Sequence, residues 1–219
     1  MSSRERKRIG ILISGRGSNM AALVEASLAV PGFPAAPSLV LSNRADAAGL
    51  EFAASHGVET AVVDHKPFGK DREAFEHALD ARLRQSGVEL VCLAGFMRIL
   101  TPWFVEQWRD RLINIHPSLL PSFKGLHTHE RALETGVRLH GCTVHFVRAE
   151  MDDGPIIAQA AVPVLPGDDP DILAARVLTM EHQLYPLALG LVAAGKVRVE
   201  GETTVFSPPE TAAEALLLA

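Results

Sequence analysis

The chain has 219 residues, is 47% hydrophobic and carries a formal net charge of −5. It has enough apolar material for one sizeable core, so we expect a single domain over residues 1–219, with a disordered start at 1–7 and a C-terminal extension at 197–219. The acidic balance excludes a nucleic-acid surface, which would need a basic stripe. No apolar stretch is long enough to span a bilayer, which argues against a membrane protein.

Strand-like and helix-like segments alternate along the chain. Strands are predicted over residues 8–14, 38–42, 60–64, 89–94, 112–116, 141–147 and 156–163. Helices are predicted over residues 19–28, 45–56, 71–86, 101–108, 129–135 and 171–194. The first strands are nearly continuous apolar runs, as expected of parallel strands covered on both faces, whereas the last two alternate and lack a helix between them. The fold class is therefore α/β, with a mostly parallel, doubly wound sheet of about seven strands and a late antiparallel pair.

The two cysteines, Cys92 and Cys142, each lie inside an apolar run. This is typical of core residues of a cytosolic protein rather than of a disulfide or a metal pair. We therefore expect a cytoplasmic location.

Three polar segments follow strands that are predicted to be parallel. Ser-Gly-Arg-Gly-Ser-Asn at 14–19 comes after the first strand, Phe-Met-Arg at 96–98 comes after the fourth, and Asn114 and His116 end the fifth. Ligands of open parallel sheets bind beyond the carboxyl ends of the strands. We therefore expect these segments on one rim, at a ligand site.

The segment 14–19 predicts a phosphate site. Its glycines allow close approach of a ligand, and the open N–H groups at the start of the following helix attract an anion. It is not a dinucleotide fingerprint, because Met20 and Ala21 stand where a third glycine would fall, and it is not a P-loop. The alternative is an ordinary tight turn, in which Ser18 or Asn19 caps the helix.

Asn114, His116 and Asp152 form the candidate catalytic set. Residues two apart on a strand share a face, so the amide and the imidazole emerge together, and Pro117 then ends the strand. An amide can stabilise an oxyanion, an imidazole can move a proton, and Asp152 can orient the imidazole. The alternative is a strand end bonded to the backbone, with Asp152 in a plain turn.

Other histidines and one acid have plainer interpretations. His127 and His129 are spaced like a metal pair, but no third ligand stands out, so we expect a structural or capping role and no metal. His140 is expected at an exposed strand start, and Glu181 is expected on a solvated helix face. His145 shares its strand face with Thr143 and could face the site, but a plain structural role is favoured.

Five motifs occur in order along the chain: the segment 14–19, Leu-Ala-Gly-Phe-Met-Arg-Ile-Leu at 93–100, Asn-Ile-His-Pro-Ser-Leu-Leu-Pro at 114–121, Gly-Leu-His-Thr-His at 125–129 and Met-Asp-Asp-Gly-Pro at 151–155. Together they resemble the phosphoribosylglycinamide formyltransferases, folate-dependent enzymes of purine biosynthesis. The resemblance extends from the first strand to about residue 186.

This resemblance implies transfer of the formyl group of 10-formyltetrahydrofolate, the co-substrate, to the amine of glycinamide ribonucleotide, by direct attack and without a metal. It implies three groups of residues. The catalytic residues would be Asn114, His116 and Asp152. The ribonucleotide would be bound by Gly17, Ser18, Asn19 and Glu181. The folate site would be lined by Arg72, Met97, Arg98, Ile99, Leu100 and Asn114.

Two positions depart from the family pattern. Asp153 stands where a glycine is usual and Ala149 where an acid is usual, both on the folate side, and Asp152 is preferred as the catalytic acid from its place in the motif.

Other functions fit parts of the pattern. A formyltetrahydrofolate deformylase uses the same three residues with water, but usually carries an N-terminal regulatory domain, for which residues before 8 leave no room. A methionyl-tRNA formyltransferase usually adds a C-terminal RNA-binding domain. A folate- or nucleotide-binding module would not need the catalytic set. A homodimer through an edge strand is compatible with the sequence.

Overall fold

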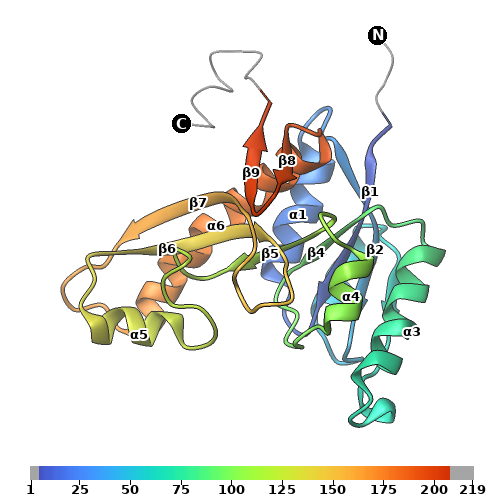
Figure 1. Ribbon diagram of the computed structural model, residues 1–219, viewed down its shortest axis with the longest axis horizontal. Helices are drawn as coiled ribbons and strands as arrows, with labels where there is room; N and C mark the ends of the chain where they lie inside the picture. Colours follow the sequence, from blue (N-terminus) through green and yellow to red (C-terminus); the bar gives the residue numbers. More distant parts are fainter. Residues whose placement is uncertain (1–4, 208–219) are drawn as a thin grey trace.

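The computed structural model describes residues 5–207, and its main feature is a seven-stranded sheet in the order β3-β2-β1-β4-β5-β6-β7 (Figure 1). The strands of this sheet are β1 (Lys7–Ile13), β2 (Ala35–Ser42), β3 (Thr60–Val62), β4 (Leu90–Leu93), β5 (Leu112–His116), β6 (Leu139–Phe146) and β7 (Ile156–Pro163). The helices are α1 (Ser18–Ala29), α2 (Gly49–Ser55), α3 (Arg72–Gln85), α4 (Pro102–Gln107), α5 (Thr128–Thr135), α6 (Pro170–Ala193) and the short 3₁₀ helix η1 (Lys66–Phe68).

The direction of the strands divides the sheet into two parts. From β3 to β5 every neighbouring pair is parallel, whereas β6 is antiparallel to β5 and β7 is antiparallel to β6. The predicted fold class and the late antiparallel pair are therefore confirmed. Because the first five strands run the same way, their carboxyl ends form one rim, which lies at the bottom of Figure 1.

The hydrophobic core lies on both faces of the sheet. Successive residues of β1 point to opposite faces. Ile11 belongs to the buried cluster that includes residues of α1, α2, α5 and α6, whereas Leu12 belongs to the cluster that includes residues of α3 and α4. On the first face the Tyr185 hydroxyl of α6 donates to Leu93 O and Ile113 O, at 3.0 and 3.2 Å. Helix α6 is thereby fixed beneath the junction of β4 and β5.

Both cysteines are fully buried and free, so the expectation that Cys92 and Cys142 are core residues is confirmed. Burial raises the pKa of the Cys142 thiol to about 12, which keeps it protonated. Among residues 5–207, no helix is both long and apolar enough to cross a membrane.

Both ends of the described chain differ from expectation. Residues 1–4 and 208–219 lie outside the described part, but Lys7 already belongs to β1, so the expected disorder does not extend to that residue. After α6 the chain forms a hairpin of β8 (Val197–Glu200) and β9 (Thr203–Phe206). The hairpin packs near the edge of the main sheet, where Thr204 Oγ1 donates to Ile156 O at 2.6 Å.

Candidate active site

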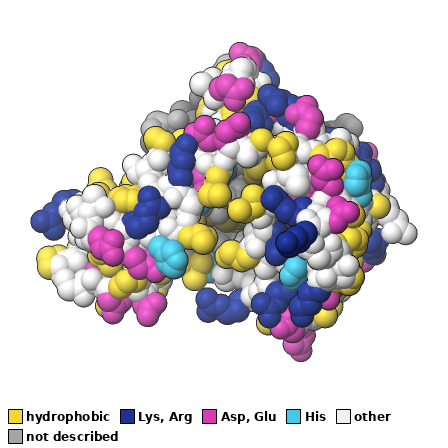
Figure 2. All heavy atoms as spheres, turned by 60° about the horizontal axis from the view of Figure 1, so that its bottom comes forward, with side chains coloured by type: hydrophobic (Ala, Val, Ile, Leu, Met, Phe, Trp, Pro, Cys, Tyr) yellow, Lys and Arg dark blue, Asp and Glu magenta, His cyan; other side chains and the backbone are white. Residues whose placement is uncertain are grey.

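The predicted site segments come together at the carboxyl rim of the parallel strands. Figure 2 turns this rim toward the reader and shows hydrophobic side chains around a hollow near its middle. Ser14, at the end of β1, links two of the segments, because its hydroxyl donates to Asn43 Oδ1 at 2.7 Å and accepts the Met97 N–H at 2.8 Å. Its own N–H donates to Gly95 O at 3.1 Å. The glycine loop and the segment after β4 therefore share one hydroxyl group.

The glycine loop leaves the start of α1 open. Gly17 is the N-cap residue with φ 73°, a left-handed conformation that suits glycine, and no side chain of a described residue caps the helix. A Cβ at Gly17 would lie 3.2 Å from the Gly49 Cα of α2. The expectation that Ser18 or Asn19 caps the helix is wrong, since α1 begins at Ser18. The first-turn N–H groups are thus left for an anionic ligand.

A buried carboxylate lies beside this helix start. Glu181 of α6 is only 7% exposed, and its Oε2 accepts a hydrogen bond from Asn19 Nδ2 at 2.7 Å. Burial raises the pKa of Glu181, while the bond from Asn19 opposes the shift. The interpretation of Glu181 as a solvated residue is therefore wrong. Asn19 Oδ1 is buried and has no hydrogen-bond partner among the described residues, so it can accept from a ligand.

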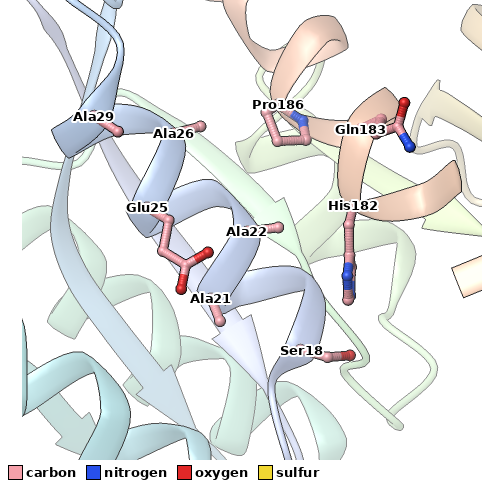
Figure 3. A pocket seen from close by; sticks show the side chains of 9 residues that line it. All are labelled: Ser18, Ala21, Ala22, Glu25, Ala26, Ala29, His182, Gln183 and Pro186. Carbon is pink, nitrogen blue, oxygen red and sulfur yellow. The ribbon is translucent and has the colours of Figure 1, made fainter. Parts of the chain in front are cut away.

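A groove of about 680 Å³ runs between α1 and α6 (Figure 3). Its lining is mostly small or polar: Ser18, Ala21, Ala22, Glu25, Ala26, Ala29, His182, Gln183 and Pro186. Figure 3 shows the His182 ring pointing toward Ser18. His182 Nε2 is buried without a hydrogen-bond partner among residues 5–207, and burial lowers the pKa of His182. The sequence offered no signal that this histidine lies beside the start of α1.

Asn114, His116 and Asp152 are brought toward one another by β5 and by the loop between β6 and β7. His116 Nδ1 lies 3.5 Å from Asp152 Oδ2, and both side chains are largely buried. His116 Nε2 lies 3.1 Å from Phe123 O, which fits a protonated Nε2 that donates to the carbonyl. Asp152 Oδ2 also accepts the Gly125 N–H at 2.8 Å. The Asp152 carboxylate therefore contacts both the His116 imidazole and the loop between β5 and α5, to which Gly125 belongs.

The neighbouring acid has a different partner. Asp153 pairs with Lys124 on the surface, whereas Asp152 adopts a left-handed conformation, φ 51°, that points its carboxylate at His116. Non-glycine residues in this conformation are uncommon and cluster at functional sites. The structure thus places Asp152, and not Asp153, against the imidazole.

The Asn114 amide is oriented by a residue that sequence reasoning set aside. Asn114 pairs with His145 across β5 and β6, and Asn114 Nδ2 lies 3.3 Å from His145 Nε2. Burial lowers the pKa of His145, so the ring is neutral, with Nδ1 donating to Phe146 O at 3.0 Å and Nε2 accepting from Asn114. This leaves the second amide N–H of Asn114 for a ligand. His145 therefore contacts the candidate catalytic set, which was the less favoured of its two interpretations.

A family model described as "Formyl transferase" matches residues 7–189, most of the chain. The chain belongs to the formyl transferase family. The phosphoribosylglycinamide formyltransferase of Escherichia coli is 47% identical over 193 residues, covering 87% of this chain and 89% of that protein. The human trifunctional purine biosynthetic protein adenosine-3 is 49% identical over 196 residues, but this chain spans only 19% of its length.

Solved structures of the formyl transferase family show the same fold. A glycinamide ribonucleotide transformylase from Symbiobacterium toebii has a TM-score of 0.89 and 45% identity, covering 94% of this chain and 95% of that chain. A formyltetrahydrofolate deformylase from Pseudomonas syringae has a TM-score of 0.86 at 27% identity, and the match covers 93% of this chain and 67% of that chain. The fold is thus shared by enzymes named for transfer and for hydrolysis.

In this formyl transferase chain the segment after β4 presents apolar side chains at the carboxyl rim of the sheet. Met97 and Ile99 are 73% and 67% exposed, whereas Leu100 is buried and anchors the segment. Arg72, at the start of α3, donates to Ile99 O at 2.7 Å, and Arg98 is half-buried. Exposed apolar residues on a segment fixed at both ends suit the flat ring of a ligand.

Three further histidines, His127, His129 and His140, lie at α5 and β6. His140 is 1% exposed, so the expected exposed position is wrong, and its Nε2 lies 3.2 Å from His129 Nδ1. Burial, together with the nearby His129, lowers the pKa of His140 to about 4. His127 is exposed and lies close to Glu130, to which its Nδ1 is 3.2 Å. Within residues 5–207 no three His, Cys, Asp or Glu side chains are grouped to hold a metal ion.

Proposed function

We propose that this protein is a phosphoribosylglycinamide formyltransferase, which transfers the formyl group of 10-formyltetrahydrofolate to the amine of glycinamide ribonucleotide. The observation that carries the proposal is the meeting of Asn114, His116 and Asp152 where β5 ends, on the same carboxyl rim from which the open start of α1 follows β1. The similarity to the Escherichia coli enzyme along most of both chains supports the choice of substrate.

The ribonucleotide is assigned to the α1 end of the site. The N–H groups that follow Gly17 can bind its phosphate, because they are unpaired by a cap and lie at the positive end of a helix dipole. Ser18 and His182 lie beside this position and add polar atoms. The Asn19 and Glu181 side chains are placed to meet the ribose and the glycinamide.

The folate co-substrate is assigned to the wall formed by the segment after β4. Apolar contacts from Met97 and Ile99 suit the pterin ring, while the buried Leu100 and Arg72 hold the backbone of this wall. Arg98 lies on the same segment and is assigned to the carboxylates of the folate tail. The formyl carbon would then lie near Asn114, between the two ligands.

The proposed reaction uses side chains of this chain only. The glycinamide amine attacks the formyl carbon, and negative charge gathers on the former carbonyl oxygen. The free Asn114 N–H and a protonated His116 stabilise that oxygen. Asp152 stabilises the positive charge on the imidazole. The C–N bond to the folate then breaks, and the proton lost by the amine reaches the folate nitrogen through His116 or a water molecule.

An assay with 10-formylfolate tests this proposal against the deformylase alternative, which the likeness to the Pseudomonas syringae enzyme keeps open. Loss of the formyl group is followed by absorbance with and without glycinamide ribonucleotide. Turnover that requires the ribonucleotide supports the transferase. Equal turnover in its absence would make the protein a hydrolase, and no turnover in either case would favour a binding module.

The proposal also covers location and assembly. A purine-biosynthetic enzyme with these small-molecule substrates would act in the cytoplasm, and a homodimer would be recognised by sedimentation at micromolar concentration.

A further inference from the structure

Arg148 is a buried charged residue that the proposed reaction does not use. It follows Val147, whose N–H donates to Leu112 O at 2.9 Å, and only 7% of its side chain is exposed. Arginine is almost never buried to this degree unless it is paired. Its partners therefore show what the guanidinium holds together.

Two acidic residues from distant parts of the chain meet the Arg148 guanidinium. Its Nη2 donates to Asp110 Oδ1 at 2.8 Å, and Asp110 sits in a left-handed turn, φ 56°, between α4 and β5. Its Nε lies 3.7 Å from Glu202 Oε2, in the turn between β8 and β9, and makes no hydrogen bond to a described residue. Because the Glu202 side chain is 74% exposed, we regard Asp110 as the stronger partner.

Arg148 opens the loop between β6 and β7, and this loop is fixed at two points. At its base the guanidinium bonds to Asp110. At its tip Asp152 Oδ2 accepts the Gly125 N–H at 2.8 Å, and Asp153 pairs with Lys124 on the surface. Where the chain returns to β7, a Cβ at Gly154 would lie only 1.7 Å from a backbone oxygen. The loop therefore has little freedom as long as its base is held.

The outer side of this loop borders open space. A cleft of about 460 Å³ separates it from α4 and from the turn between β8 and β9. The cleft is lined by Pro102, Val105, Glu106, Arg109, Arg148, Ala149, Glu150, Asp153 and Glu202. Since no side chain of residues 5–207 fills this space, the charged link at Arg148, and not apolar packing, limits outward movement of the loop.

We propose that Arg148 is a positioning residue, which fixes the loop between β6 and β7 through Asp110 so that the Asp152 carboxylate stays against His116. The proposal rests on the proposed function, in which Asp152 acts on His116 during formyl transfer. Arg148 acts through the backbone of residues 149–152 and does not contact the reacting atoms. Because the ribonucleotide end is built from α1 and α6, loss of Arg148 should spare it.

The first test replaces Arg148 with methionine, which keeps an aliphatic stem and removes the charge. We expect kcat to fall on the order of 10–100-fold, because a displacement of about 1 Å can have an effect of this size. KM for the folate should rise, and KM for the ribonucleotide should stay unchanged. Arg148→Lys should recover part of the activity, since an ammonium can meet one acid but lacks the planar fork of arginine.

Two further variants keep the test decisive if Arg148→Met does not fold. Asp110→Asn removes the charge from the stronger partner, leaves Arg148 in place and should give the same pattern of kinetic changes. Arg176→Met is the matched control, because Arg176 also bonds to an acid, Asp168, through two short hydrogen bonds at 2.6 and 2.8 Å. The control should lower Tm without changing kcat or either KM.

Hydrogen exchange at the Gly125 amide reports the position of Asp152 without any turnover. Exchange should be faster in Arg148→Met and Asp110→Asn than in the wild type, and unchanged in Arg176→Met. Wild-type Gly125 protection or wild-type kcat in Arg148→Met would overturn the inference, as would equal rises of both KM values. A wild-type protein without ribonucleotide-dependent turnover would instead refute the proposed function, while Gly125 exchange would still decide whether Arg148 holds the loop.

Discussion

The two ends of the proposed site are built by different means. At the α1 end the backbone N–H groups are the groups available to a ligand, and Gly17 contributes by having no side chain. At the β5 end the chemistry depends on side chains, and each is oriented by a residue from another segment: Asn114 by His145, and His116 by Asp152. Changes at the first end should therefore alter affinity, and changes at the second should alter turnover.

The largest effect should follow replacement of His116 by alanine. We expect kcat to fall by about 10²–10⁴-fold, because the group that moves the proton is removed. The affinity for glycinamide ribonucleotide, measured by calorimetry, should stay within about twofold. That is far less than the tenfold change that corresponds to about 1.4 kcal/mol of binding free energy. An unchanged kcat would refute the role of His116.

Replacement of His145 tests whether Asn114 must be oriented as well as present. His145→Leu removes the acceptor for the Asn114 amide, so the amide can rotate, and kcat should fall roughly 10–100-fold. His145→Gln retains an acceptor oxygen and should lose less. Steady-state kinetics of both variants, compared with Asn114→Ala, would show whether the two residues act as a unit. Equal activity of His145→Leu and His145→Gln would contradict the role of His145 as an acceptor that orients the Asn114 amide.

The α1 end is tested by a pair of glycine variants. Gly17→Ala places a Cβ in a left-handed conformation and 3.2 Å from Gly49, so it should destabilise the protein by roughly 1–3 kcal/mol and raise KM for the ribonucleotide. Gly57→Ala is the control, since Gly57 also has a positive φ, 74°, but lies outside the segment 14–19 and its Cβ would meet nothing within 4 Å. Urea unfolding and kinetics check both. A fall in kcat for Gly17→Ala without a rise in KM would contradict the assignment of the α1 end to binding.

The smallest effect should be on the pH dependence of protein stability, through the buried residue His140. In the folded protein burial lowers the pKa of His140 to about 4, from an ordinary value of 6.5. Between these values the unfolded chain binds a proton that the folded chain does not, so stability should fall as pH drops from about 6.5 toward 4. His140→Gln should flatten this part of the curve of unfolding free energy against pH. Parallel curves would show that His140 does not contribute.

Much of the fold could be predicted because it depends on local patterns. The apolar runs indicated the strands, with the bounds of β5 and β7 correct to the residue. The motif also led to Asn114, His116 and Asp152, whose catalytic roles stay predictions. The contact between His145 and Asn114 depends on how β6 is registered against β5, which no local pattern states.

The burial of individual polar residues was also not predictable from the sequence. Polar residues such as Glu181 and His140 were assigned to the surface, because polar side chains usually lie there. Their burial arises from tertiary contacts, with Asn19 for Glu181 and with His129 for His140. The β8–β9 hairpin was missed for a similar reason, since its stability comes from packing near the sheet edge.

The Ser14 hydroxyl has a consequence for how the two substrates affect one another. It bonds both to Asn43, which follows β2, and to the backbone of Met97, on the segment proposed to bind the folate. If ribonucleotide binding shifts this hydroxyl, the folate wall shifts with it. The resulting coupling free energy would be reciprocal, so that each substrate changes the affinity for the other by the same factor.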